Sequence, residues 1–185
     1  MRKGILFAVA LGVALALKAH VTPNVVLMRR GDFVKASLPG ATKFFEKTFQ
    51  APARAAVRSE TGWTPSGDDT KIYVGREEGG RLVGSVVFLW MPSQHGPVGI
   101  GVAFGPAGTI LRATVTDVGS EPLVWVRPLL RDGVIAGLDG ISPSVSPDPG
   151  RIAPETSGAM SRYYAKVIAE GVSWAQAIEK ASITS

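Results

Sequence analysis

Four stretches rich in β-branched and aromatic residues, joined by short connections, constrain the fold of this chain more than any other feature. They cover residues 71–77, 81–90, 98–104 and 109–118. The second stretch contains the run VVFLW, and apolar and polar residues alternate in part of the fourth; both patterns are typical of strands. The connections are glycine-containing turns, which join antiparallel neighbours. The sequence therefore predicts an antiparallel meander at the centre of the fold.

Helical signals precede the meander. Asp32 is a candidate N-cap for a helix over residues 33–38, which the Pro-Gly pair at 39–40 should end. Helical patterns continue toward residue 60, but Pro52 should limit how far a helix extends there. Residues 61–70 are rich in turn formers and predict a loop.

The C-terminal part is expected to combine a loop with a helix. Residues 157–181 carry an apolar helical face, with Gly171 as the expected break between two short helices. Residues 123–138 fit either a short helix or a strand. Four prolines indicate an irregular loop over residues 139–155. We therefore expect an α+β fold, in which a twisted antiparallel sheet packs against N- and C-terminal helices, as one domain over residues 31–185.

Residues 1–30 are predicted to form an N-terminal membrane anchor. Residues 4–17 are apolar or small and have the length of the hydrophobic region of a signal peptide. The apolar character then resumes and reaches Met28, which gives 25 residues, enough for a tilted transmembrane helix. Residues 14–16 (Ala-Leu-Ala) are a candidate cleavage site, so cleavage is the alternative to a retained helix. Both outcomes place the main domain on the periplasmic or extracellular side. A retained helix makes the chain a single-pass membrane protein.

Composition excludes several kinds of chemistry. The chain has no cysteine, which excludes disulfides, thiolate metal sites and cysteine nucleophiles. Its two histidines, His20 and His95, are too few for a multi-histidine metal site. The net charge of +5 is too diffuse to indicate a nucleic-acid partner. Redox chemistry would therefore need an organic cofactor or a partner chain.

Three polar features outside the C-terminal helix are better explained as surface structure than as catalytic groups. Asp68 and Asp69 lie in a turn-rich loop without the ligand spacing of a calcium loop. Glu77 and Glu78 are adjacent, so a strand would point them to opposite faces. His95 is expected at the tip of a loop between two strands. No catalytic set assembles from these residues.

The start of the C-terminal helix is the most informative candidate site. Small and hydroxyl-bearing residues there would let a ligand approach the backbone, and free N–H groups at a helix N-terminus attract anions such as phosphate. An ordinary capping segment with Thr156 or Ser157 as N-cap is the alternative. The candidate binding residues are Thr156, Ser157, Gly158, Ala159, Met160 and Ser161.

The order of motifs over residues 33–180 resembles the FMN-binding domain family. The similarity rests on LPGA at 38–41, the glycine-rich strands from 80 to 118, SEP at 120–122 and SGAMS at 157–161. The family includes the G subunit of Rnf complexes, the C subunit of the sodium-pumping NADH:quinone oxidoreductase and the regulator of nitrous oxide reduction. Its members often combine one N-terminal membrane anchor with a domain outside the cytoplasm.

In that family the flavin is attached through its phosphate to the threonine of a Ser-Gly-Ala-Thr motif. Ser157, Gly158 and Ala159 match this motif, and Met160 occupies the acceptor position. Methionine has no hydroxyl, so a phosphoester cannot form at this position. Ser161 would point about 100° away from position 160 on a helix. The resemblance thus implies FMN held non-covalently, a domain that has lost the flavin, or a domain that binds another ligand.

The resemblance also implies a role and partners. The chain would be a membrane-anchored subunit of an electron-transfer complex, with the other subunits as partners, and not a stand-alone enzyme. Trp90, Trp125 or Tyr163 could stack on the flavin ring, although each also suits core packing. The alternatives are a non-catalytic accessory subunit that braces a membrane redox complex without flavin, and a free periplasmic ligand-binding module after signal cleavage.

Overall fold

A six-stranded antiparallel sheet forms the centre of the molecule. The computed structural model describes residues 23–65 and 70–183. The strand order is β1-β6-β5-β4-β3-β2. The strands of this sheet are β1 (Asn24–Val26), β2 (Lys43–Lys47), β3 (Lys71–Arg76), β4 (Leu82–Met91), β5 (Val98–Phe104) and β6 (Ile110–Gly119).

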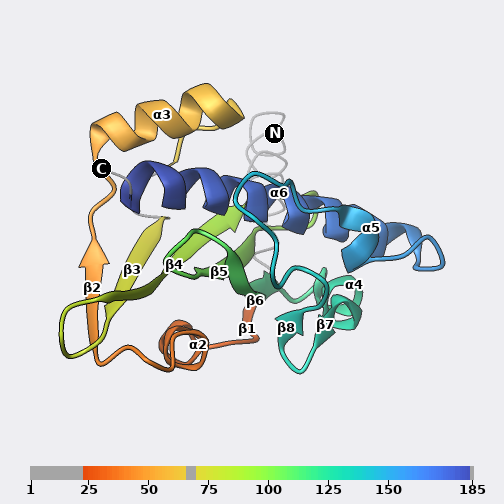
Figure 1. Cartoon of the computed structure of the whole chain (residues 1–185). Helices are drawn as coiled ribbons and strands as arrows, with labels where there is room; N and C mark the ends of the chain where they lie inside the picture. The colour runs from red at the N-terminus through yellow and green to blue at the C-terminus, as the bar shows by residue number, and fades with distance from the viewer. Residues whose placement is uncertain (1–22, 66–69, 184–185) are drawn as a thin grey trace, which may run out of the picture.

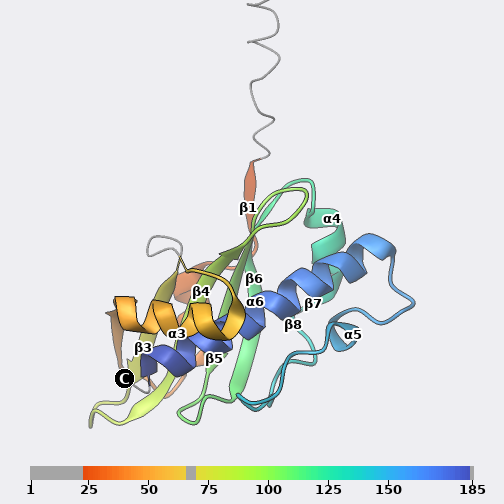
Figure 2. The same cartoon turned by 90° about the horizontal axis from the view of Figure 1, so that it is seen from above.

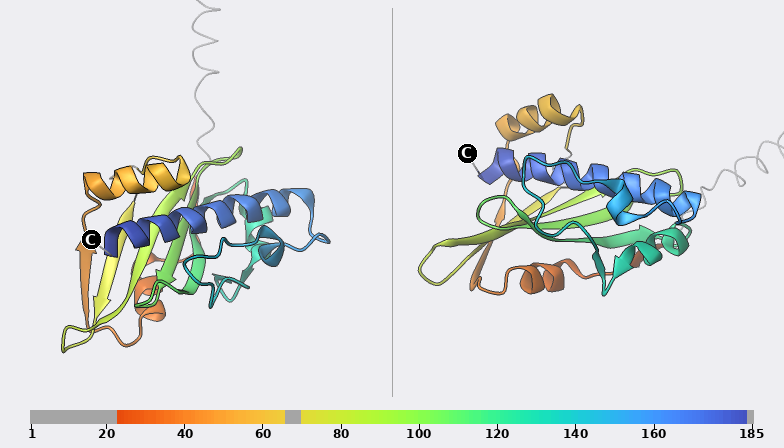
Figure 3. Two further views of the ribbon diagram at one scale, coloured as in Figure 1. Left: turned by 45° about the horizontal axis from the view of Figure 1, so that its top comes forward. Right: turned by 45° about the vertical axis from the view of Figure 1, so that its right-hand side comes forward.

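Helices cover both faces of this sheet, which gives three layers (Figures 1 and 3). The long helix α6 (Ala159–Ile183) crosses one face with α3 (Ala51–Thr61) beside it, and α2 (Arg30–Ser37) lies on the opposite face. Figure 2 shows α6 running obliquely over the strands, from the region of α4 (Leu123–Val126) toward the end where α3 lies. The predicted α+β class and antiparallel sheet are confirmed.

The predicted meander is also confirmed, and its strands β3 to β6 begin and end close to the expected positions. Each strand pairs with the next in sequence, from Lys71↔Phe88 in the first pair to Val98↔Val118 in the last. The turn at residues 105–108 closes through a hydrogen bond from Gly108 N to Gly105 O of 2.9 Å. The short connections thus fixed the pairing.

Two edge strands were not predicted. Phe44 and Phe45 lie in β2, which pairs with β3, and not in a helix. At the other edge, β1 pairs with β6 from Asn24↔Gly119 to Val26↔Asp117. A transmembrane helix reaching Met28 is therefore wrong for its last residues, because Asn24–Val26 are extended. Residues 1–22 of the predicted anchor, including the candidate cleavage site at 14–16, lie outside the described residues.

The main core lies between the sheet and α6. Ile100, Val102 and Phe104 of β5 point toward α6 and are fully buried there, together with Tyr164 and Ile168 of the helix. Alternation along an extended strand places every second residue on this face. The face is covered by one unbroken helix.

Gly171 does not break α6, so the predicted division into two short helices is wrong. The helix runs without interruption from Ala159 to Ile183. Gly171 is buried, and a Cβ there would lie 2.5 Å from Ile100 Cδ1 and 2.7 Å from Met91 Cγ. The glycine is needed because the helix backbone lies directly on the strands.

A smaller core lies under α2. The β5 residues on this face are glycine and alanine, which leaves space for Phe33 of α2 and Phe88 of β4. The two rings meet edge to face, with centroids 6.0 Å apart. A Cβ at Gly101 would lie 2.8 Å from the Phe88 ring. The helix begins at Arg30, so Asp32 lies in its first turn and is not the N-cap that was predicted.

Leu38 caps the C-terminal end of α2, and its side chain packs on two glycines of the sheet. Gly75 and Gly84 are partners in neighbouring strands. A Cβ on either would come within 2.9 Å of a Leu38 methyl group. Leu38 is 1% exposed, so this contact anchors the segment that follows α2.

Helix α3 corrects a further prediction. Pro52 stands in the first turn of this helix, which begins at Ala51 and ends at Thr61. Proline is tolerated in a first turn because the N–H it lacks would have no partner within the helix. Pro52 therefore starts a helix and does not limit one.

The region between β6 and α6 is compact and irregular. Residues 123–138, which fit either helix or strand, contain both: α4 and the 3₁₀ helix η1 (Arg127–Leu129) precede a short hairpin of β7 (Leu130–Arg131) and β8 (Val134–Ile135). The expected loop over residues 139–155 contains one short helix, α5 (Pro149–Ile152). Among the described helices, none combines the length and apolar character needed to cross a membrane.

The packing of Leu38 on Gly75 and Gly84 yields a stability prediction. Gly84→Ala would place a methyl group 2.2 Å from Phe104 O and 2.8 Å from Leu38 Cδ2. Overpacking of this kind costs about 1–3 kcal/mol, and contact with backbone places this variant at the upper end. Chemical denaturation of the two proteins measures the loss.

Gly31→Ala in α2 is the matched control, since nothing lies within 4 Å of its Cβ. It should gain about 0.5 kcal/mol from the better helix propensity of alanine. Equal stability of Gly84→Ala and the parent protein would contradict the proposed packing of Leu38.

Candidate functional site

The predicted binding segment lies at the N-terminus of α6. Ser157 precedes the helix and donates its backbone N–H to Pro154 O over 2.8 Å. Gly158 and Ala159 are exposed, and no atom lies within 4 Å of a Cβ built at Gly158. Thr156 is exposed in the preceding turn. This part of the segment presents open backbone to solvent.

The last two residues of the segment are used for packing. Met160 is half-buried and packs against the main core. Ser161 donates its hydroxyl to Trp125 O over 3.1 Å, which links α6 to α4. The six predicted residues are therefore contiguous, but only Thr156 to Ala159 remain accessible.

Arg162 holds the turn before α6 in place. Its Nη1 donates to Glu155 O over 2.7 Å and also to Ser157 O. Both bonds draw the turn against the first turn of the helix. The guanidinium therefore lies beside the open backbone of Gly158.

An open pocket of about 570 Å³ adjoins this turn. Its lining carries two cations on one helical face, because Arg162 and Lys166 are four residues apart. The helix N-terminus adds the partial positive charge of its free N–H groups. The lining residues are Glu155, Ala159, Arg162, Tyr163 and Lys166.

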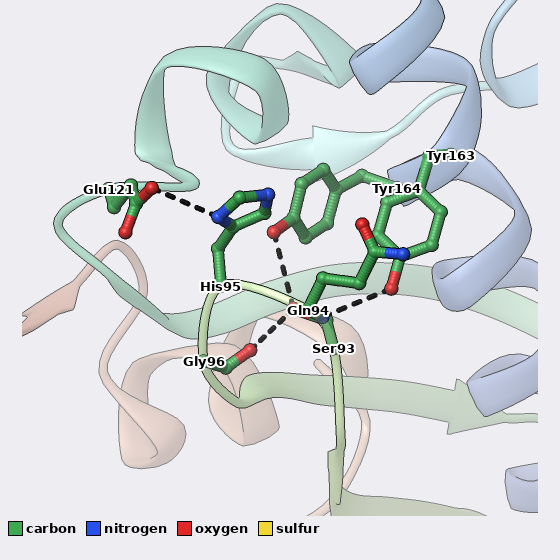
Figure 4. A network of polar contacts seen from close by, with 7 residues as sticks. All are labelled: Ser93, Gln94, His95, Gly96, Glu121, Tyr163 and Tyr164. Carbon is green, nitrogen blue, oxygen red and sulfur yellow. Dashed lines mark hydrogen bonds and ion pairs between the residues drawn. The ribbon is translucent and has the colours of Figure 1, made fainter.

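A network of aromatic and polar side chains supports the same end of α6 (Figure 4). His95 Nδ1 lies 2.9 Å from Glu121 Oε1, and its ring lies 5.1 Å from that of Trp125. Trp125 in turn stacks on Tyr164, with centroids 6.0 Å apart. His95 was predicted at a loop tip; it lies in that loop, where its ring packs on α4.

Two tyrosines of α6 fix the same loop. Tyr163 accepts a hydrogen bond from Gln94 N over 3.1 Å, and the Tyr164 hydroxyl lies 3.2 Å from Ser93 Oγ. Ser93 donates its own proton to Gly96 O over 2.5 Å. The serine hydroxyl is thus engaged by groups other than His95, and these residues do not form a serine–histidine–carboxylate relay.

The aromatic candidates for flavin stacking have different surroundings. Trp125 is covered by His95 and Tyr164. Trp90 lies on the α2 face, with the Arg30 guanidinium 5.9 Å from its ring centroid. Tyr163 lines the pocket beside Ala159. Of the three, Tyr163 is placed to contact a ligand bound there.

The remaining polar candidates do not form a site. Glu77 pairs with Arg81 at 2.6 Å and Glu78 with Lys43 at 3.0 Å, at the turn predicted for them. Asp68 and Asp69 lie outside the described residues. In the part of the chain that the structure describes, no three acidic or histidine side chains gather to hold a metal ion.

Arg162 and Lys166 were not predicted as parts of this region. The helical spacing of Arg162 and Lys166 after Gly158 was a usable signal, because it places both cations next to the first turn. Glu121 belongs to the SEP motif at 120–122, but its contact with His95 carried no sequence signal, since the two residues are 26 positions apart on different loops.

Comparison with known proteins yields no relative: no protein-family model matches the sequence, and no curated protein matches it. The chemistry of the site therefore rests on its own residues. Open backbone, a helix N-terminus and two cations together suit a phosphate or a similar anion.

Tyr164 provides a pH-dependent test of this region. Burial raises the pKa of its phenol above 10.0, and the hydrogen bond with Ser93 offsets this only in part. A folded-state pKa above the unfolded value means that the neutral phenol stabilises the fold fully below pH 10, and that this contribution is lost as the pH rises further. Tyr164→Phe should cost about 1 kcal/mol at pH 7 through the lost hydrogen bond.

Denaturation of both proteins at several pH values between neutral and strongly alkaline measures this effect. Above pH 10 the Tyr164→Phe protein should lose stability less steeply than the parent. Parallel curves for Tyr164→Phe and the parent would contradict the buried phenol.

Proposed function

We propose that this chain is a membrane-anchored subunit of an electron-transfer complex, whose extracytoplasmic domain holds FMN non-covalently by its phosphate. One observation carries the proposal. The motif Ser157-Gly158-Ala159, which resembles the flavin-attachment motif of FMN-binding domains, opens α6 with accessible backbone beside Arg162 and Lys166. A phosphate there would meet free N–H groups and two cations.

The residues present fit a phosphate ester. Gly158 has no side chain and open space around it, so a phosphate can approach its backbone closely. Glu155 is the one acidic residue of the pocket lining, and the Arg162 guanidinium bonds its carbonyl oxygen. The positive charge therefore exceeds the negative charge in this pocket.

The next two residues of the segment, Met160 and Ser161, favour reversible binding of the flavin. Met160 lacks an acceptor hydroxyl, and its side chain packs on the core. The Ser161 hydroxyl is donated to Trp125 O. Neither side chain can carry a phosphoester in this arrangement, so the flavin would be released on unfolding.

FMN, when bound, supplies one- and two-electron transfer. The chain's own residues would position it. The α6 N-terminus and Lys166 would hold the phosphate, while Arg162 keeps the turn in the binding geometry. Tyr163 would present its ring to the bound molecule, with its hydroxyl fixed by Gln94 N.

A non-catalytic accessory subunit is the second candidate, and a specific observation favours it. Trp125, whose carbonyl oxygen accepts a hydrogen bond from Ser161, is already stacked on Tyr164 and approached by His95. In the accessory function, this cluster would brace the loop and α4 for contact with another subunit. Val124 of α4, which is 66% exposed, adds an apolar side chain to that surface.

Substitution of Gly158 tests phosphate binding. Gly158→Asp adds a carboxylate at the N-terminus of α6, where it favours the helix but repels a phosphate. FMN should bind this variant at least about tenfold more weakly than the parent, a loss of about 1.4 kcal/mol. Titration of flavin fluorescence measures both dissociation constants.

Gly158→Asn is the matched control, because it has nearly the same shape without the charge. It should bind FMN within a few-fold of the parent. Riboflavin, which lacks the phosphate, should bind more weakly than FMN and should not distinguish the two variants. FMN binding that ignores the charge at position 158 would place the phosphate elsewhere, and no FMN binding by the folded parent would leave the accessory function.

A further inference from the structure

Glu179 is a buried carboxylate near the C-terminal end of α6. It is 7% exposed. Ser85 donates a hydrogen bond to it, with the hydroxyl 3.5 Å from Glu179 Oε1. In the described part of the chain, no lysine, arginine or histidine pairs with it. Burial raises the pKa of this carboxyl, and the Ser85 hydrogen bond opposes that rise only in part.

The buried carboxylate borders a surface pocket of about 470 Å³. The turn at residues 105–108 forms one wall, and Gly108 allows it to approach closely. A Cβ at Gly108 would lie 3.3 Å from Glu179 Oε2, and the residue has a φ of +76° that favours glycine. The other apolar lining residues are Leu82, Pro106, Ala107, Pro143 and Ile183.

A second, more apolar groove continues from this pocket. Leu82 and Ile183 line both hollows. Beyond them the groove is lined by Phe45, which is 52% exposed, and by Val74 of the neighbouring strand. One end of the combined groove therefore carries the carboxylate of Glu179. The other end combines these apolar side chains with the charged residues Glu46, Lys47 and Arg76.

We propose that this groove binds a primary ammonium group on an apolar chain, with the ammonium at Glu179 and the chain along Leu82, Ile183 and Phe45. An ammonium group would give the carboxylate the charged hydrogen-bond partner that it lacks, which a buried carboxylate strongly favours. The apolar chain would cover side chains that water now reaches. The site is separate from the proposed flavin site, since residues 159 and 179 are about 30 Å apart along α6.

The other charged groups near the pocket are already paired. Lys180 lines it, but its ammonium lies 3.1 Å from Glu60 Oε2 on α3. Arg81, next to Leu82, pairs with Glu77 at 2.6 Å. In the adjoining groove, Arg76 donates to Gly80 O over 2.8 Å, and Lys47 donates to Ser182 O. Glu46, the acidic residue of the adjoining groove, pairs with Lys71 at 2.9 Å, so among the described lining residues Glu179 is the carboxylate that has no cation partner.

Titration of the full chain with n-hexylammonium chloride at constant ionic strength tests the proposal, with n-hexanol as the uncharged probe. Calorimetry or amide chemical shifts should give a dissociation constant at least about tenfold lower for the ammonium than for the alcohol. Shortening the chain to n-butyl should weaken binding by roughly three- to fourfold per methylene removed. The pKa of Glu179, followed by carboxyl NMR, should fall when the ammonium binds.

Two variants and one control make the result decisive. Glu179→Gln keeps the shape of the side chain and should lose at least about tenfold in ammonium affinity. Ala107→Trp leaves the carboxylate intact, but its bulk should obstruct the pocket and also abolish binding. Glu170→Gln, an exposed glutamate on the same helix, should bind as the parent does.

Three results would overturn the proposal. They are equal affinity for hexylammonium and hexanol, unchanged affinity in Glu179→Gln, and no saturable binding of hexylammonium by the folded parent. None of them bears on FMN binding, so the two proposals can fail separately.

Discussion

The direct contact of α6 with the sheet is the constraint on which the rest of the structure depends. At Gly171 the helix backbone lies against Ile100 and Met91, with no room for a methyl group between them. This close approach buries Tyr164 and Ile168 over the same strands and covers a largely apolar face of the sheet. It also fixes both ends of the helix, and both proposed binding sites are at these ends.

The opposite face of the sheet follows the same principle with different residues. Here three strand glycines leave the space, which Phe33 of α2, Phe88 of β4 and Leu38 fill. Gly101 makes space for Phe33 and Phe88, and the Gly75–Gly84 pair makes space for Leu38. Gly75, Gly84 and Gly101 thus mark where an aromatic or aliphatic side chain packs directly on the strand backbone.

The sequence predicted the meander well because each strand is followed by a short turn that leaves one pairing available. It failed where a residue has two physical roles. Gly171 was interpreted as a helix break, although a buried glycine in a helix also permits close packing. Pro52 was interpreted as a limit, although a first-turn proline starts a helix. Strand β1 depends on pairing with residues more than 90 positions away, which local patterns do not encode.

The candidate site was likewise predictable from the sequence only in part. The position of residues 157–159 at a helix N-terminus followed from the sequence, and so did the chemical consequence of Met160. The neighbours that give the site its character were not predictable in the same way. Trp125 reaches α6 because α4 folds back onto the helix, and Glu179 meets Ser85, which lies 94 positions earlier in the chain.

The absorption spectrum of the full chain, purified under native conditions and then denatured, tests the central claim most directly. The claim predicts flavin bands close to one FMN per chain in the folded protein, and their complete separation from the protein after denaturation and filtration. A folded protein without flavin bands would contradict FMN binding. Flavin that stays with the denatured chain would contradict the non-covalent attachment inferred from Met160.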